Sequence, residues 1–93
     1  MHYGKMVAPV DRTQKTLKSG VVVKSSVFHY IEGDREDRYF YHQGREVAWM
    51  EITPEGRALY FNGKYLKDPN LKDIRSLIRR RAKAQVISEY MAG

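Results

Sequence analysis

The sequence contains no cysteine among its 93 residues. This absence excludes disulfide bonds, thiolate zinc sites and cysteine nucleophiles. A domain of this size without such crosslinks depends on good packing, on oligomerisation or on a partner. The length is enough for one domain, residues 1–93, and too short for two. A chain without cysteine also fits a reducing compartment, so we expect a cytoplasmic protein.

Long apolar runs are absent as well. No segment approaches the ~20 apolar residues that cross a bilayer, and the first residues lack the apolar run of a signal peptide. The three histidines do not form a paired zinc motif, and no glycine-rich phosphate loop occurs. We therefore expect no membrane contact, no metal, no cofactor and no catalytic site. A small nuclease that uses a basic surface is a further alternative, although no obvious metal cluster occurs in the sequence.

Positive charge is in excess. Lysine and arginine number 17 against 11 aspartates and glutamates, for a formal net charge of +6. Such a balance favours polyanionic partners, namely DNA, RNA or an acidic membrane surface, although charge also serves solubility alone.

Residues 1–19 follow no clear period and predict an irregular N-terminal arm, with a short strand around Met6–Val10 as an option. Residues 20–32 are rich in β-branched and aromatic side chains and predict a strand. The segment GDREDR, residues 33–38, carries alternating charges and no apolar residue, which is typical of a solvated loop.

Three further apolar and aromatic runs are separated by turn residues, which predicts an antiparallel meander within residues 20–66. The predicted strands are Tyr39–Gln43, Glu46–Ile52 and Arg57–Asn62, with a short extension at Lys64–Leu66. Residues 53–60 also fit a helix start, with Thr53 as cap and Pro54 in the first turn. Gly56 and Gly63 would weaken that helix by up to ~1 kcal/mol each, so a hairpin is the preferred prediction.

Residues 71–91 predict one helix, with Asn70 as N-cap and Asp73 near the positive end of the helix dipole. Its apolar stripe consists of Leu71, Ile74, Leu77, Ile78, Ala82 and Val86. The predicted fold is α+β, an antiparallel meander of about four strands packed against one long C-terminal helix.

A cationic ridge lies beside this stripe. At spacings of three and four, Lys72, Arg75, Arg79 and Lys83 share one side of the helix, and Arg80 widens the ridge. Like charges at these spacings repel one another, and a polyanion would convert that repulsion into attraction. We therefore expect these five residues to contact phosphates; a solvated face is the alternative.

Aromatic residues alternate with basic ones along the meander. Exposed rings on a basic sheet stack on unpaired bases, while buried rings only build the core and cross-strand pairs. The sheet-side candidates for nucleic-acid contact are Arg45, Arg57 and Tyr60. The combined hypothesis is a small non-enzymatic nucleic-acid-binding protein, and the pattern is common to DNA and RNA, duplex and single strand.

The apolar pattern drifts after Ala84. The residues Val86, Ile87, Tyr90 and Met91 no longer follow the stripe, which indicates a break in the helix or a separate contact surface. A second copy of the chain or a protein partner is expected to bind there. The alternative function is accordingly a protein-interaction module, a regulator or inhibitor of a larger assembly, that uses this end and the N-terminal arm.

Overall fold

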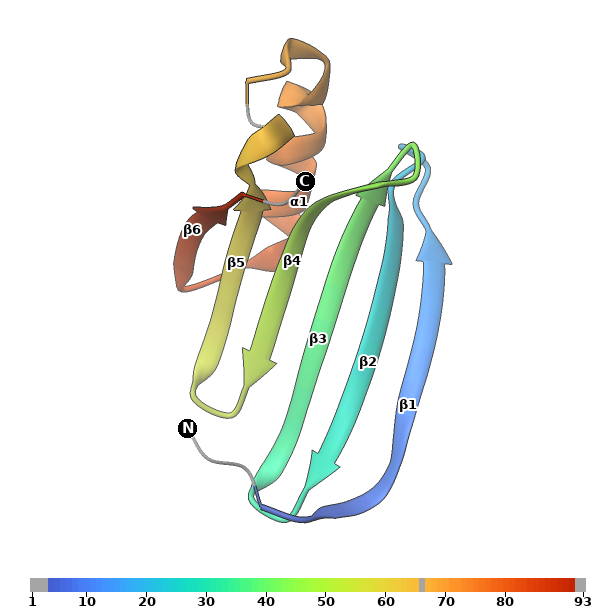
Figure 1. Cartoon of the computed structure of the whole chain (residues 1–93), viewed down its shortest axis with the longest axis vertical. Helices are drawn as coiled ribbons and strands as arrows, with labels where there is room; N and C mark the ends of the chain where they lie inside the picture. Colours follow the sequence, from blue (N-terminus) through green and yellow to red (C-terminus); the bar gives the residue numbers. More distant parts are fainter. Residues whose placement is uncertain (1–3, 66, 92–93) are drawn as a thin grey trace.

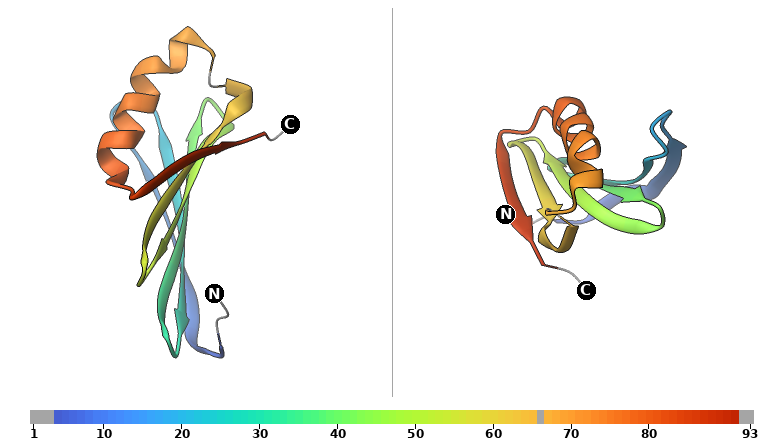
Figure 2. Two further views of the ribbon diagram at one scale, coloured as in Figure 1. Left: turned by 90° about the vertical axis from the view of Figure 1, so that its left-hand side faces the viewer. Right: turned by 90° about the horizontal axis from the view of Figure 1, so that it is seen from above.

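The computed structural model describes residues 4–65 and 67–91, which form a six-stranded sheet with one α-helix on one face (Figures 1 and 2). The strands are β1 (Met6–Thr16), β2 (Val22–Tyr30), β3 (Gly33–His42), β4 (Arg45–Thr53), β5 (Gly56–Asn62) and β6 (Val86–Tyr90). Their order in the sheet is the order in the sequence. Strands β1 to β5 pair with one another in antiparallel fashion, and β6 is parallel to β5.

A crossover connects β5 to β6, as parallel neighbours require. It consists of two 3₁₀ turns, η1 (Gly63–Tyr65) and η2 (Pro69–Leu71), followed by the helix α1 (Lys72–Ala82). The carboxylate of Asp68 accepts a hydrogen bond from the backbone N–H of Asn70 and thereby caps η2. The predicted cap at Asn70 is therefore wrong, because η2 comes first and α1 begins at Lys72, one residue after the predicted start.

The predicted fold class is wrong in its strands and in its helix. The sheet has six strands and mixed pairing, and the predicted helix 71–91 ends at Ala82. Lys83 adopts a left-handed conformation, φ 48° and ψ 44°, which stops the helix. The N–H of Gln85 then donates to the carbonyl of Arg57, and residues 86–90 pair with β5. The drift after Ala84 marks this change from helix to strand.

The predicted N-terminal arm contains β1, whose residues are almost all exposed. Backbone pairing with β2 holds this strand. Because the strand buries no apolar face, its sequence shows no alternation of apolar and polar residues. The predicted loop 33–38 is the first half of β3. Its charges neutralise each other two residues apart, because Arg35 bonds Asp37 at 3.1 Å and Arg38 bonds Glu36 at 2.7 Å. Residues two apart share a face of a strand, which explains how so polar a segment stays extended.

The preferred hairpin between β4 and β5 is confirmed. The backbone N–H of Glu55 donates to the hydroxyl of Thr53, and Gly56 adopts a φ of 149° that side chains rarely tolerate. The predicted strand extension after Asn62 is wrong, since residues 63–65 form η1, which turns the chain away from the sheet. Leu66 lies outside the described residues.

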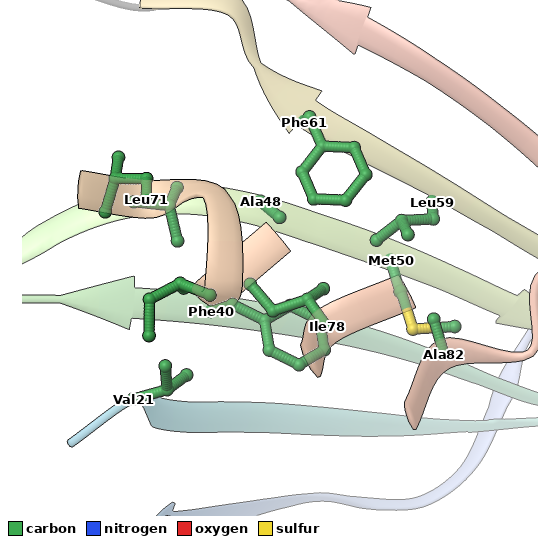
Figure 3. Close-up of a cluster of buried hydrophobic side chains, with 11 residues drawn as sticks. Val21, Phe40, Ala48, Met50, Leu59, Phe61, Leu71, Ile78 and Ala82 are labelled. Carbon is green, nitrogen blue, oxygen red and sulfur yellow. The ribbon is translucent and has the colours of Figure 1, made fainter. Parts of the chain in front are cut away.

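The core lies between α1 and one face of β3, β4 and β5 (Figure 3). Leu59 and Met50 are fully buried under Ile78, which is 1% exposed. Each such side chain contributes roughly 1.5–3 kcal/mol on burial. The helix stripe is confirmed for Leu71, Ile74, Ile78 and Ala82, while Leu77 is only partly buried and Val86 belongs to β6.

Within residues 4–65 and 67–91, no helix has both the length and the apolar character that crossing a membrane requires. The only α-helix there has 11 residues and includes three consecutive arginines.

Candidate functional site

A groove of about 480 Å³ runs between α1 and β6. Three basic residues of α1, Lys72, Arg75 and Arg79, line one wall, because spacings of three and four place them on one side of the helix. The floor and the outer side come from β5 and β6. The full lining is Phe61, Lys72, Arg75, Ser76, Arg79, Ile87, Ser88 and Glu89. Figure 2 shows α1 above the sheet with β6 beside it.

The positive charge of the protein is concentrated at this helix. Residues 72–83 contain six cations and one carboxylate, a net charge of +5 out of +6 for the whole chain. Within the described residues, none of these six cations forms an ion pair. Arg75 is half-buried in the groove, while Lys72 and Arg79 are exposed. The groove should therefore attract anions, because few carboxylates of the protein offset its positive charge.

The other predicted phosphate ligands of the helix lie outside this groove. Arg80 and Lys83 are exposed, and Lys83 is the residue at which the helix ends. The three cations of the groove are thus part of the predicted ridge. The other two ridge residues carry the positive charge on to the end of α1.

Two of the predicted sheet-side residues have structural contacts. The guanidinium of Arg57 donates to the carbonyl of Ala82 at 3.1 Å and satisfies a backbone acceptor at the end of α1. Arg45 lies over the ring of Tyr65, 5.6 Å from its centre. Neither residue lines the groove.

The third sheet-side candidate, Tyr60, lies on the face of the sheet opposite α1. Register places it in a row with Trp49 and Tyr39 across three strands. The ring centres of Trp49 and Tyr60 are 4.7 Å apart with planes at 16°, and those of Tyr39 and Trp49 are 6.1 Å apart at 20°. Because the rings stack on each other, one face of the Tyr60 ring is already covered by Trp49.

Carboxylates accompany the aromatic row. Asp37 and Glu51 share its face, and Arg35 contacts both, at 3.1 Å and 3.9 Å. Burial, followed by the charge of Asp37, raises the pKa of Tyr39. The aromatic face is therefore less basic than the helix face, and the predicted nucleic-acid residues are divided between the two faces.

The residues predicted as a partner interface are divided as well. Val86 is 55% exposed and Met91 76% exposed, whereas Ile87 lines the groove. Tyr90 is half-buried, and its hydroxyl donates to the carboxylate of Glu46 at 2.5 Å. Burial and this hydrogen bond raise the pKa of Tyr90. Tyr90 therefore links β6 to β4 by a hydrogen bond that passes over β5.

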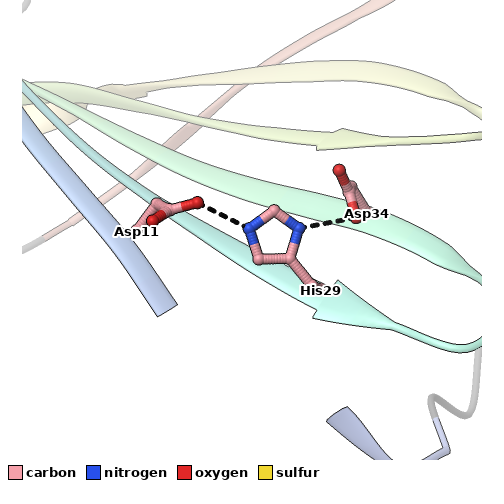
Figure 4. A network of polar contacts seen from close by, with 3 residues as sticks. All are labelled: Asp11, His29 and Asp34. Carbon is pink, nitrogen blue, oxygen red and sulfur yellow. Dashed lines mark hydrogen bonds and ion pairs between the residues drawn. The ribbon is translucent and has the colours of Figure 1, made fainter. Parts of the chain in front are cut away.

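His29, which the sequence singles out for no role, lies between Asp11 and Asp34 (Figure 4). Its Nε2 is 2.7 Å from Asp11 and its Nδ1 is 3.0 Å from Asp34. Carboxylates only accept, so both contacts are hydrogen bonds when both ring nitrogens carry protons. These bonds, first that to Asp11, raise the pKa of His29. Both nitrogens are occupied, and the described part of the chain holds no cluster of three metal-ligating side chains.

A second groove, of about 450 Å³, lies on the other side of α1, over β1, β2 and β3. Its basic residues are Lys15, Arg38 and Arg81. The sequence could not indicate this grouping, because it depends on β1 being a strand of the same sheet. Arg38 is neutralised by Glu36, so this groove carries less uncompensated charge than the first.

In comparisons with models of protein families, with curated proteins and with solved structures, the chain has no significant match.

Proposed function

We propose that this protein is a small non-enzymatic nucleic-acid-binding protein that holds the phosphate backbone in the groove between α1 and β6. The observation that carries the proposal is the row of Lys72, Arg75 and Arg79 along one wall, without an ion-pair partner in the described chain. At a rise of 1.5 Å per residue the row covers about 10 Å of helix axis, which suits a few neighbouring phosphates.

In the free protein, the cations of α1 repel one another. Like charges three and four residues apart destabilise an exposed helix by a few tenths of a kcal/mol per pair. A phosphate backbone removes this repulsion and releases its own condensed counterions on binding. Because the surplus charge continues past the groove to Arg80, Arg81 and Lys83, a polymer satisfies more of it than a single small anion does.

The test is a binding titration with fluorescently labelled DNA and RNA, single-stranded and duplex, at several salt concentrations. If about three phosphates are neutralised, log K falls against log[salt] with a slope of about −2 for a single strand, or steeper where further cations take part. The double variant Arg75→Gln/Arg79→Gln should weaken binding severalfold and flatten the slope.

The matched control is Arg80→Gln/Arg81→Gln, which removes the same charge from the adjacent turn outside this groove. Equal losses in the two double variants would assign binding to general charge and reject the groove. Absence of binding to all four nucleic acids at ~50 mM salt, where phosphate contacts are strong, would reject the proposed function.

A further inference from the structure

The floor of the α1–β6 groove is chemically different from its cationic wall. Ile87 is 47% exposed and Phe61 is 6% exposed, and both lie beside Glu89. Register places Ile87 opposite Leu59 and Glu89 opposite Phe61, so both β6 side chains are on the helix side of the sheet. The groove thus combines cations, an apolar surface and a single carboxylate.

Glu89 is the feature that phosphate binding alone leaves unexplained. A carboxylate in a phosphate groove repels the ligand, and this one is exposed and forms neither an ion pair nor a hydrogen bond within the described chain. It does not neutralise the helix cations. An ionised carboxylate only accepts hydrogen bonds, so it suits a neutral group that presents N–H donors.

The geometry points to a single-stranded nucleic acid as the ligand, with one unpaired guanine resting on the exposed side chain of Ile87 and donating to Glu89. This inference rests on the proposed function and adds the strandedness and the base. Lys72, Arg75 and Arg79 hold the phosphates on either side of that base. A groove of about 480 Å³ lies within the ~300–1,000 Å³ range of sites that hold small organic groups.

We infer a single strand because the groups that this groove would contact are inaccessible in a duplex. In a duplex, the flat faces of the bases are stacked and their Watson–Crick edges are paired, so neither the apolar floor nor Glu89 has a group to contact. Unpaired bases expose both, and sequence-specific RNA recognition uses them in this way. The groove is also a corner between a helix and a sheet, into which an extended strand fits.

Guanine follows from the pattern of donors. Its Watson–Crick edge carries two adjacent donors, N1–H and the N2 amino group, which match the two oxygens of one carboxylate. Adenine and cytosine present one amino group beside an acceptor, and uracil or thymine presents one N–H between two acceptors. A bidentate contact discriminates against the wrong base by about fivefold or more.

The experiment measures the affinity of short labelled oligonucleotides that carry G, A, C or T at one central position in a thymine background, together with the matching duplexes. The expected result is tighter binding of single strands than of duplexes, with G preferred by about fivefold or more. Glu89→Gln should abolish the preference for G while the other three oligonucleotides bind as well as before or better, because a negative charge is removed.

Glu55→Gln is the control, since it removes the same charge from an exposed residue in the β4–β5 turn outside this groove. It should keep the preference for G. Three results would overturn the inference and leave the proposed function standing. They are duplexes bound at least as tightly as single strands, equal affinities for the four bases, and an equal change for all four in Glu89→Gln. Failure of every oligonucleotide to bind would reject the proposed function itself.

Discussion

At the scale of single residues, the charge of His29 couples three strands. The imidazole is on β2, Asp11 is on β1 and Asp34 is on β3. Folding raises the pKa of His29 above its ordinary value of 6.5, mainly through the hydrogen bond to Asp11. The stability that protonated His29 contributes is therefore fully present below pH 6.5, and it is lost as the pH rises through the raised pKa of the folded state.

The first prediction concerns pH. The difference in free energy of unfolding between the protein and His29→Gln should be largest below pH 6.5 and should shrink as the pH rises above the folded-state pKa. Denaturant unfolding at a series of pH values measures it, and an NMR titration of His29 gives the pKa. In Asp34→Asn the pKa of His29 should fall only part of the way, because Asp11 remains. A difference that grows with pH would contradict the assignment.

The sequence predicts some residue roles and not others, for a physical reason. Helical spacing alone brings Lys72, Arg75 and Arg79 to one side, so their grouping follows from a local pattern. The role of Arg57 depends on where the end of α1 lies against β5, and that of Glu89 depends on the parallel pairing of β5 and β6. That pairing joins distant segments, and no local pattern reports it.

At the scale of elements, the β4–β5 hairpin contacts Gln85, the residue just before β6. The backbone N–H of Arg57 donates to the side-chain carbonyl of Gln85 at 2.9 Å, and a Cβ atom on the neighbouring Gly56 would meet that same side chain. The glycine therefore serves two purposes, because its φ of 149° is also unfavourable for any other residue.

The second prediction compares two glycines. Gly56→Ala should destabilise the protein by about 1–3 kcal/mol from backbone conformation, and by more if the bond from Arg57 to Gln85 is displaced. Gly44 has a φ of 77°, and a Cβ atom there meets nothing within 4 Å. Gly44→Ala should therefore show only the backbone cost, about 1 kcal/mol. Urea unfolding of the two variants measures this, and a larger effect at Gly44 would refute the role of Gln85.

The strands that the sequence predicts are those with apolar periodicity and turn residues on both sides, namely β2, the second half of β3, β4 and β5. The strands that were missed, in whole or in part, lack this signal. Neither β1 nor the first half of β3 buries an apolar face. Backbone pairing holds both, and ion pairs between residues two apart also hold the first half of β3. A search for oppositely charged residues at spacing two would have indicated the extended form of residues 35–38.

At the scale of the whole molecule, burial is concentrated on one side. The helix covers β3, β4 and β5, while β1 lies at the far edge of the sheet (Figure 2). In β1 only one residue of 11 is even half-buried. Local stability follows buried contacts, so the sheet should be firm under the helix and weaker toward β1.

The third prediction is a gradient of amide hydrogen exchange. The hydrogen-bonded amides of β4 and β5 should exchange most slowly, at rates close to those set by global unfolding, and those of β1 should exchange fastest among the paired strands. Exchange measured by NMR or mass spectrometry resolves the strands. His29→Gln at pH 6 should accelerate exchange in β1 more than in β5. Equal protection of β1 and β4 would contradict the gradient.

The parallel placement of β6 also sets the order in which the groove is completed during synthesis. The cations of α1 are synthesised before Ile87 and Glu89, by about a second at ordinary rates of translation. The residues of the cationic wall are therefore synthesised before those that β6 contributes to the groove. If the groove selects an unpaired base, a nascent chain has its attraction for phosphate first and acquires its selectivity only when β6 joins the sheet.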